Sequence, residues 1–216
     1  MGTQVPKQFL TLGGVPLLVH SLRVLDAAEW VHDIILAVPE ADRESCLRDI
    51  VTPHGFKKVR QIVAGGAERQ DSVRHALEAV EGGADLVLVH DAVRPFLTVE
   101  MVARVLERAA AVGAAIVAIP MRDTVKRVSP DRLIEDTVER HGLWLAQTPQ
   151  AFRTGLLREA HQTALAEGKR ATDDAQLVEW LGRPVGIVEG TAENIKITRP
   201  EDLGIGEAIL AARAKR

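Results

Sequence analysis

Hydrophobic positions fall into two kinds of segment, which alternate along the first 120 residues. Continuous apolar runs at residues 34–38, 59–64, 85–89 and 114–119 are typical of strands covered on both faces. Apolar residues spaced by three and four predict amphipathic helices before the first run, at 16–25, and between the later runs, at 69–80 and 98–112. This alternation predicts an α/β fold with a Rossmann-like, mostly parallel sheet and helices on both faces.

The alternation stops at residue 121. From there to residue 137, polar and apolar residues alternate around a Ser129-Pro130-Asp131 turn, which predicts a projecting β-arm at about residues 121–142. Such an arm often pairs with a partner chain. A short apolar run at 143–146, helices at about 153–167 and 173–181, a strand near 185–188 and a helix after Pro200 follow. With 216 residues and no linker, residues 1–216 are expected to form a single domain.

Composition narrows the range of functions. The chain is 46% hydrophobic and 26% charged, as in ordinary globular proteins. A net charge of −3 without blocks of like charge, and only 3% aromatic residues, disfavour nucleic acid as a partner. No apolar run reaches membrane-spanning length, so no membrane association is expected. The single cysteine, Cys46, fits a reducing compartment, and we expect a cytoplasmic protein.

Ligands bind at the carboxyl ends of strands in open α/β sheets, which limits the search for a site. Gly65 and Gly66 stand at such an end, where their backbone N–H groups could hold a nucleotide's oxygens, with Ser72 nearby; a tight turn is the alternative. Asp91 ends the third strand, where it is expected to bind magnesium with substrate phosphates unless it caps a turn. Arg94 follows and could meet a phosphate or hydroxyl.

Three more cations are candidates for contacts with phosphoryl oxygens. They are Lys7, Lys196 and Arg140, although each, taken alone, fits a solvated surface charge as well. No histidine has metal-ligand spacing, and Cys46 has no identifiable activating base. No G-x-G-x-x-G motif follows a first strand, which disfavours a hydride-transferring Rossmann enzyme.

Eight short motifs occur in order along the chain. They are P-K-Q-F-L from Pro6, G-G-A-E-R-Q-D-S-V from Gly65, H-D-A-V-R-P from His90, R-D-T-V-K-R from Arg122, R-H-G-L-W from Arg140, T-P-Q from Thr148, T-D-D-A from Thr172 and E-N-I-K-I-T-R-P-E-D-L from Glu193. In this order and spacing, the chain closely resembles the 2-C-methyl-D-erythritol 4-phosphate cytidylyltransferases of the non-mevalonate isoprenoid pathway.

The resemblance implies a nucleotidyltransferase that joins CTP to methylerythritol phosphate. The products would be 4-diphosphocytidyl-2-C-methyl-D-erythritol and pyrophosphate, with Mg²⁺ or another divalent cation as cofactor. It also implies a homodimer in which the arm crosses into the neighbouring subunit's active site. Such chemistry needs charge neutralisation and in-line positioning rather than a strong base, because the nucleophile is a phosphate dianion.

The resemblance also implies roles for individual residues. Lys7 would stabilise the charge that develops on the α-phosphate, while Arg140 and Lys196 would position methylerythritol phosphate. The remaining candidates would surround the two substrates and the metal: Gly65, Gly66 and Ser72 at CTP, Asp91, Arg94 and Thr148 at the sugar and metal, and Thr124 at the arm.

One part of the family pattern has no counterpart in the sequence. Family members open with an apolar strand and an A-A-G-x-G-x-R-M loop around the CTP phosphates, whereas Met1 aligns with the methionine that ends that loop. We therefore expect the first strand and the glycine-rich loop to be missing from the given sequence, and little catalysis if Met1 is the true start. A ribitol 5-phosphate cytidylyltransferase and a non-catalytic dimeric remnant are the alternatives.

Overall fold

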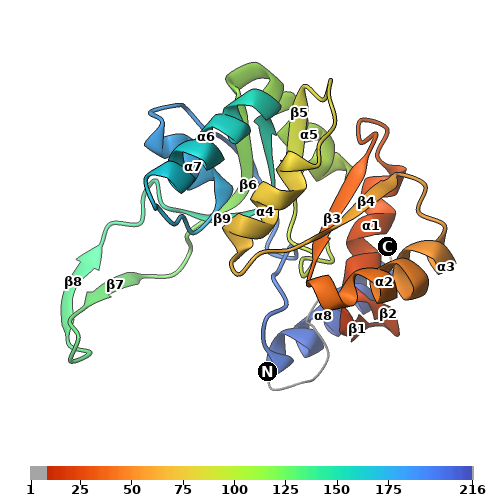
Figure 1. The fold of residues 1–216 in the computed structure, drawn as a ribbon. Coiled ribbons are helices and arrows are strands. Elements are labelled where there is room, and N and C mark those ends of the chain that lie inside the picture. The colour runs from red at the N-terminus through yellow and green to blue at the C-terminus, as the bar shows by residue number, and fades with distance from the viewer. Residues whose placement is uncertain (1–8, 216) are drawn as a thin grey trace.

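The computed structural model describes residues 9–215 (Figure 1). The helices are α1 (Leu17–Ala27), α2 (Arg43–Ser45), α3 (Thr52–His54), α4 (Arg69–Glu78), α5 (Val99–Val112), α6 (Thr154–Ala166), α7 (Asp174–Trp180) and α8 (Pro200–Arg213), with a 3-10 helix η2 (Glu40–Asp42) and a π-helix η3 (Cys46–Val51). The strands are β1 (Thr11–Leu12), β2 (Val15–Pro16), β3 (Ile34–Val38), β4 (Val59–Ala64), β5 (Leu86–Val89), β6 (Ala114–Pro120), β7 (Val125–Val128), β8 (Ile134–Val138), β9 (Trp144–Arg153) and β10 (Gly186–Glu189).

The four apolar runs predicted as strands are β3, β4, β5 and β6. The three predicted helices are α1, which precedes β3, and α4 and α5, which lie between the later strands. Helix α5 begins where expected because the Thr98 hydroxyl accepts a hydrogen bond from the Met101 N–H. The antiparallel pair of β1 and β2 was not predicted, since two residues per strand leave no periodicity to detect.

A four-stranded sheet with the order β10-β6-β9-β5 forms the centre of the fold. Strands β5, β6 and β10 run in one direction and β9 runs against them, so the prediction of a mostly parallel sheet is confirmed with one exception. The short run predicted at 143–146 is only the start of β9. Three polar residues interrupt the apolar pattern beyond it, yet all three are buried: Gln147, Thr148 and Gln150.

Helices cover both faces of this sheet (Figure 1). Ala115 and Val117 of β6 pack against Val105 of α5, whereas Ala114 packs with Leu157 of α6 on the opposite face. Successive residues of a strand point to opposite faces, so one apolar run supplies both layers of the core.

Strands β3 and β4 form a separate parallel pair. Leu36 of β3 shares a core cluster with Leu22 of α1 and Val102 of α5, so α5 packs on both sheets. Among residues 9–215, β3 pairs only with β4 and β5 pairs only with β9, which leaves each of these strands one unpaired edge.

The predicted arm is the antiparallel hairpin of β7 and β8, which projects from the body of the molecule (Figure 1). Its turn is closed by a hydrogen bond from the Ser129 N–H to the Leu133 carbonyl, and Arg132 adopts a left-handed φ of 62°. The arm exposes Val128, Leu133 and Ile134, and Leu133 is 69% exposed. Exposed apolar groups of this kind favour contact with another surface. Over residues 9–215, no helix is long and apolar enough to cross a membrane.

Candidate active site

A cavity of about 240 Å³ opens at the carboxyl end of β5, beside the middle of β9. Its lining includes four residues that the sequence singled out: Asp91, Arg94, Thr148 and Lys196. They come from segments far apart in the chain, namely the turn after β5, strand β9 and the segment between β10 and α8. The position agrees with the rule that open α/β sheets bind ligands at strand ends.

Three cations surround the carboxylate of Asp91. Arg69 Nε lies 2.9 Å from Oδ1, Lys196 Nζ lies 2.8 Å from Oδ2, and Arg94 Nε lies 3.9 Å from Oδ2. Burial alone would raise the pKa of Asp91, but the positive charges of Arg69 and Lys196 outweigh it and lower that pKa to about 2. Asp91 is therefore ionised at neutral pH and holds these cations at the cavity.

Arg69 is a site residue that the sequence analysis missed. It is the first residue of α4 and bridges two carboxylates, because its Nη1 also lies 2.7 Å from Oδ2 of Asp174. Burial acts to lower the pKa of Arg69, but Asp174 and Asp91 raise it above its ordinary value. Asp174 is buried and also contacts Nε2 of His161 at 3.1 Å. Two sequence signals could have indicated Arg69: its place directly after a strand-end loop, and its presence in the motif G-G-A-E-R-Q-D-S-V that starts at Gly65.

Two guanidinium nitrogens beside Asp91 lack hydrogen-bond partners within the described residues. They are Nη2 of Arg69 and Nε of Arg94, and both atoms are buried. Burial lowers the pKa of Arg94, against the opposing effect of Asp91. Buried donors without a partner are uncommon in folded proteins. A phosphate or hydroxyl oxygen in the cavity is the kind of group that satisfies them.

Asn194 fixes the segment that carries Lys196. Its buried side-chain amide donates to Gln147 Oε1 at 3.1 Å and to the Thr148 carbonyl at 2.9 Å. The backbone carbonyl of Asn194 accepts a hydrogen bond from Arg94 Nη1 at 2.8 Å. The segment is thereby attached to both β9 and the turn after β5. Asn194 and Gln147 were not predicted, since polar residues in strands and loops give no sign of their burial.

Thr148 is buried, and its hydroxyl lies inside a chain of hydrogen bonds. Oγ1 accepts from the Asp91 N–H at 3.0 Å and lies 3.1 Å from Nδ1 of His90. Nε2 of His90 lies 3.1 Å from the Arg94 carbonyl. Burial lowers the pKa of His90 to about 4, and Arg94 and Arg69 act in the same direction, so the imidazole is neutral at neutral pH.

The prediction of free N–H groups at Gly65 and Gly66 is wrong. The Gly65 N–H donates to the Val38 carbonyl at 2.7 Å, and the Gly66 N–H donates to Ser72 Oγ at 3.0 Å. A Cβ at Gly66 would collide with Cβ of Asp71, and one at Gly65 would lie 3.0 Å from Ser72 Oγ. The alternative of a tight turn is thus the better one: these glycines permit close packing, and Ser72 caps the turn.

Asp91 offers a single carboxylate as a possible metal ligand. Both of its oxygens are already paired with cations, and no group of three or more acidic, histidine or cysteine side chains that could hold a metal occurs within residues 9–215. These residues form no prebuilt metal site. A magnesium ion held mainly by substrate phosphates needs one or two carboxylates, so Asp91 fits only if Lys196 first turns away.

Of the other three predicted residues, Thr124 and Arg140 do not line the cavity. Lys7 lies outside the described residues. Thr124 is exposed just before β7, and Arg140 is exposed just after β8, with its Nη1 bonded to the Arg122 carbonyl. The cavity and the base of the arm are therefore separate features of this chain.

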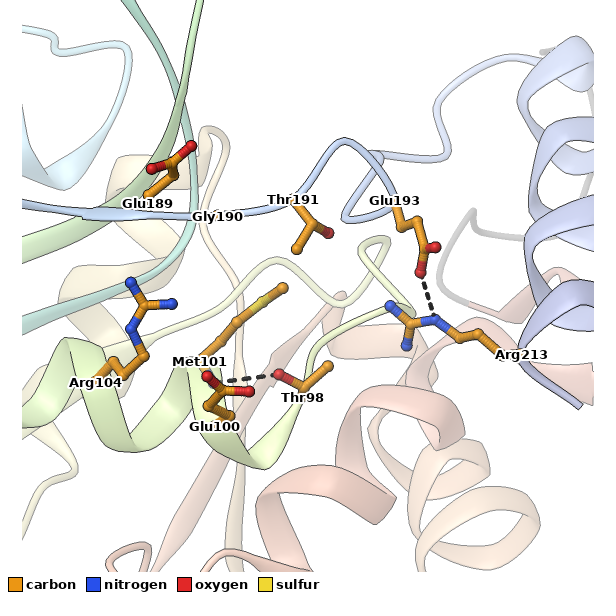
Figure 2. A pocket seen from close by; sticks show the side chains of 9 residues that line it. All are labelled: Thr98, Glu100, Met101, Arg104, Glu189, Gly190, Thr191, Glu193 and Arg213. Carbon is orange, nitrogen blue, oxygen red and sulfur yellow. Dashed lines mark hydrogen bonds and ion pairs between the residues drawn. The ribbon is translucent and has the colours of Figure 1, made fainter. Parts of the chain in front are cut away.

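A larger cavity, of about 440 Å³, lies between the start of α5, the end of β10 and the end of α8 (Figure 2). Figure 2 shows Arg213 paired with Glu193 there, at 2.9 Å. None of the predicted site residues that fall within 9–215 lines this cavity. The smaller cavity is therefore the better candidate for the active site, because two guanidinium nitrogens without hydrogen-bond partners among residues 9–215 lie there beside the carboxylate of Asp91.

Comparisons with known proteins give one answer. The family model described as 2-C-methyl-D-erythritol 4-phosphate cytidylyltransferase matches residues 1–212. Curated proteins of that name from Syntrophotalea carbinolica and Geobacter metallireducens are 47% and 49% identical to the chain; each match covers 97% of it, and 90% and 91% of those proteins.

Solved structures are also similar. The 2-C-methyl-D-erythritol 4-phosphate cytidylyltransferase from Thermus thermophilus is 42% identical with a TM-score of 0.81, and the match covers 95% of this chain and 94% of that one. The 4-diphosphocytidyl-2C-methyl-D-erythritol synthase from Anaerococcus prevotii is 32% identical with a TM-score of 0.88, with 97% and 92% covered.

Proposed function

Because the chain belongs to the 2-C-methyl-D-erythritol 4-phosphate cytidylyltransferase family, we propose that the cavity beside Asp91 is where it transfers a cytidylyl group. The protein is an enzyme that joins CTP to 2-C-methyl-D-erythritol 4-phosphate, giving 4-diphosphocytidyl-2-C-methyl-D-erythritol and pyrophosphate. The observation that carries the choice of cavity is the convergence of Arg69, Arg94 and Lys196 on the carboxylate of Asp91, whose side chain is only 12% exposed.

The charges in this cavity suit phosphoryl transfer. The attacking group is a phosphate dianion, so its approach to another phosphate needs positive charge and alignment rather than a general base. Lys196 is 40% exposed at its side chain and can turn from Asp91 toward a phosphate, whereas Arg69 and Arg94 are held more firmly. We assign contact with the sugar phosphate to Lys196 and Arg94, and a contact with the developing α-phosphate charge to Lys7.

The arm supplies the remaining contacts in this proposal. Thr124 and Arg140 stand at its base, outside the cavity of their own chain, and the arm exposes apolar side chains. A second copy of the chain that pairs with the arm would bury those side chains. We therefore propose a homodimer in which the arm brings Thr124 and Arg140 to the partner's cavity.

The proposal also covers the metal ion, the domain organisation and the cellular location of the protein. Magnesium would enter with the phosphates of CTP, where it neutralises their charge, and Asp91 is the one protein ligand proposed for it. Residues 1–216 would act as one nucleotidyltransferase domain. Cys46 is free and buried, which supports a cytoplasmic location.

The test is magnesium-dependent release of pyrophosphate from CTP, with methylerythritol phosphate and ribitol 5-phosphate assayed side by side. The assay uses the chain as given and a version that carries the family's strand and A-A-G-x-G-x-R-M loop at its N-terminus. Release with methylerythritol phosphate supports the proposal, whereas release only with ribitol 5-phosphate, or from neither protein, contradicts it.

A further inference from the structure

His90 touches the cavity's central residues without lining the cavity itself. Phosphoryl transfer between two phosphates does not need it as an acid or a base. We propose that His90 is a positioning residue, which holds Asp91 through the hydroxyl of Thr148 and holds Arg94 through its backbone carbonyl. This inference rests on the proposed function of the cavity.

The hydrogen bonds around His90 fix which ring nitrogen carries the proton. A carbonyl oxygen can only accept, so Nε2 must donate to the Arg94 carbonyl, 3.1 Å away. In the neutral imidazole, Nδ1 is then an acceptor, and the Thr148 hydroxyl donates to it at 3.1 Å. The Asp91 N–H donates to Thr148 Oγ1 at 3.0 Å and completes the chain.

This arrangement changes the role expected for Thr148. Its hydroxyl proton goes to His90 and one of its lone pairs receives the Asp91 N–H, so the hydroxyl has no proton left for a substrate. Thr148 therefore acts mainly by holding Asp91, rather than by donating a hydrogen bond to the sugar phosphate.

His90 also stabilises both ends of the turn that presents Asp91 and Arg94. The Arg94 N–H donates to the Asp91 carbonyl at 2.9 Å and closes the turn. The Arg94 carbonyl accepts from His90 and, at 3.2 Å, from Ser21 Oγ of α1. The imidazole thus connects this turn to β9 on one side, and the same carbonyl connects it to α1 on the other.

Two substitutions of His90 separate its two bonds. In His90→Asn, the side-chain oxygen can replace Nδ1 as acceptor for Thr148, while the bond to Arg94 is lost. In His90→Gln, the side-chain amide can replace Nε2 as donor to the Arg94 carbonyl, while the acceptor for Thr148 is lost. His32→Asn and His32→Gln are the matched controls, because His32 is exposed and outside the site.

We expect His90→Gln to lower kcat/KM for methylerythritol phosphate by about 10-fold, because small displacements of positioning groups slow phosphoryl transfer strongly. The KM for CTP should stay within about twofold, since the affected turn is assigned to the sugar phosphate. Thr148→Val should reproduce this pattern, and Thr148→Ser should restore activity. The double variant His90→Gln/Thr148→Val should lose little more activity than either single variant, because both substitutions remove the same hydrogen bond, between the Thr148 hydroxyl and the side chain at position 90.

An unchanged kcat/KM for methylerythritol phosphate in His90→Gln, or wild-type kinetics in Thr148→Val, would overturn the assignment. A second measurement does not depend on activity: ¹⁵N NMR of the histidine rings, with the His90 signals identified by their absence from His90→Gln. A neutral ring protonated at Nε2 supports the inference, and one protonated at Nδ1 contradicts it. An inactive wild-type enzyme with the expected tautomer would count against the proposed function alone.

Discussion

The cluster around Asp91 and the projecting arm differ in how their charged side chains are held in place. In the cluster, Asp91 and Arg94 have side chains that are 12% exposed, and each is fixed by partners from other segments. In the arm, Arg140 is exposed and bonded only to a nearby carbonyl, and Leu133 is 69% exposed. One region is complete within a single chain, and the other has surface that is still available to a partner.

This contrast indicates a division of labour. A hydrogen-bonded network that is shielded from solvent fixes the positions of charged side chains, which suits residues that must contact a phosphate at a fixed distance. An exposed hairpin can only be positioned by what it docks on. In the proposed homodimer, the first half of the predicted site would depend on the core of one subunit, and the second half on assembly.

Loss of a charge inside the cluster should have the largest effect. We expect Lys196→Ala to lower turnover about 100-fold to 1,000-fold, the usual effect of removing a group that stabilises transition-state charge. Lys7→Ala should also lower turnover strongly. Circular dichroism should show an intact fold, since Lys196 is partly exposed. Lys57→Ala, at an exposed position, is the control, and normal turnover in Lys196→Ala would reject the assignment.

Loss of a charge on the arm should act on one substrate. We expect Arg140→Ala to raise the KM for methylerythritol phosphate about 10-fold or more while the KM for CTP changes little, because the arm is assigned to the sugar phosphate. Arg127→Ala removes an exposed ion pair on the same arm and should have little effect. Equal changes for the two substrates would show that the arm is not selective.

The cluster should also be detectable in the pH dependence of stability. The pKa of Asp91 is lowered in the folded protein to about 2, so its contribution is present above its unfolded pKa near 4 and is lost as the pH falls toward 2. The expected size is about 2 kcal/mol. Urea unfolding at pH 7 and pH 3 measures it: the difference between wild type and Asp91→Asn should shrink at the lower pH, and a constant difference would contradict the assignment.

Replacing an exposed apolar residue of the arm by a charged one should weaken dimer assembly without destabilising the fold. We expect Leu133→Glu to weaken the dimer about 10-fold, because it removes an apolar contact of the size of one side chain. Light scattering across a concentration series measures the change. Lys126→Ala on β7 is a suitable control. A dimer unaffected by Leu133→Glu would place the interface elsewhere.

The two regions also differ in how well sequence reasoning foresaw them. Apolar runs and helical spacing located β3 to β6 and the arm, because those patterns follow directly from which faces are buried. Strand β9 was predicted too short because Gln147, Thr148 and Gln150 are polar, and their burial depends on partners such as Asn194.

The site shows the same limit. Asp91, Arg94, Thr148 and Lys196 were found from motifs and strand ends, and the fold does bring them together. Arg69 was missed because a helix's first arginine resembles any surface charge until Asp91 and Asp174 are placed around it. Gly66 was misjudged because only the structure shows Ser72 and Asp71 against it.

The central claim is that an active site combines the cluster of one subunit with the arm of another. Mixing the Lys196→Ala and Arg140→Ala variants under conditions of subunit exchange tests it directly. At equal amounts, half of the dimers contain one of each, and each of these has one intact site. Assayed at a methylerythritol phosphate concentration well below its KM, where both parent homodimers have about a tenth of wild-type activity or less, the mixture should return to about a quarter of wild-type activity. No recovery, despite exchange shown by differently tagged subunits, would contradict the claim.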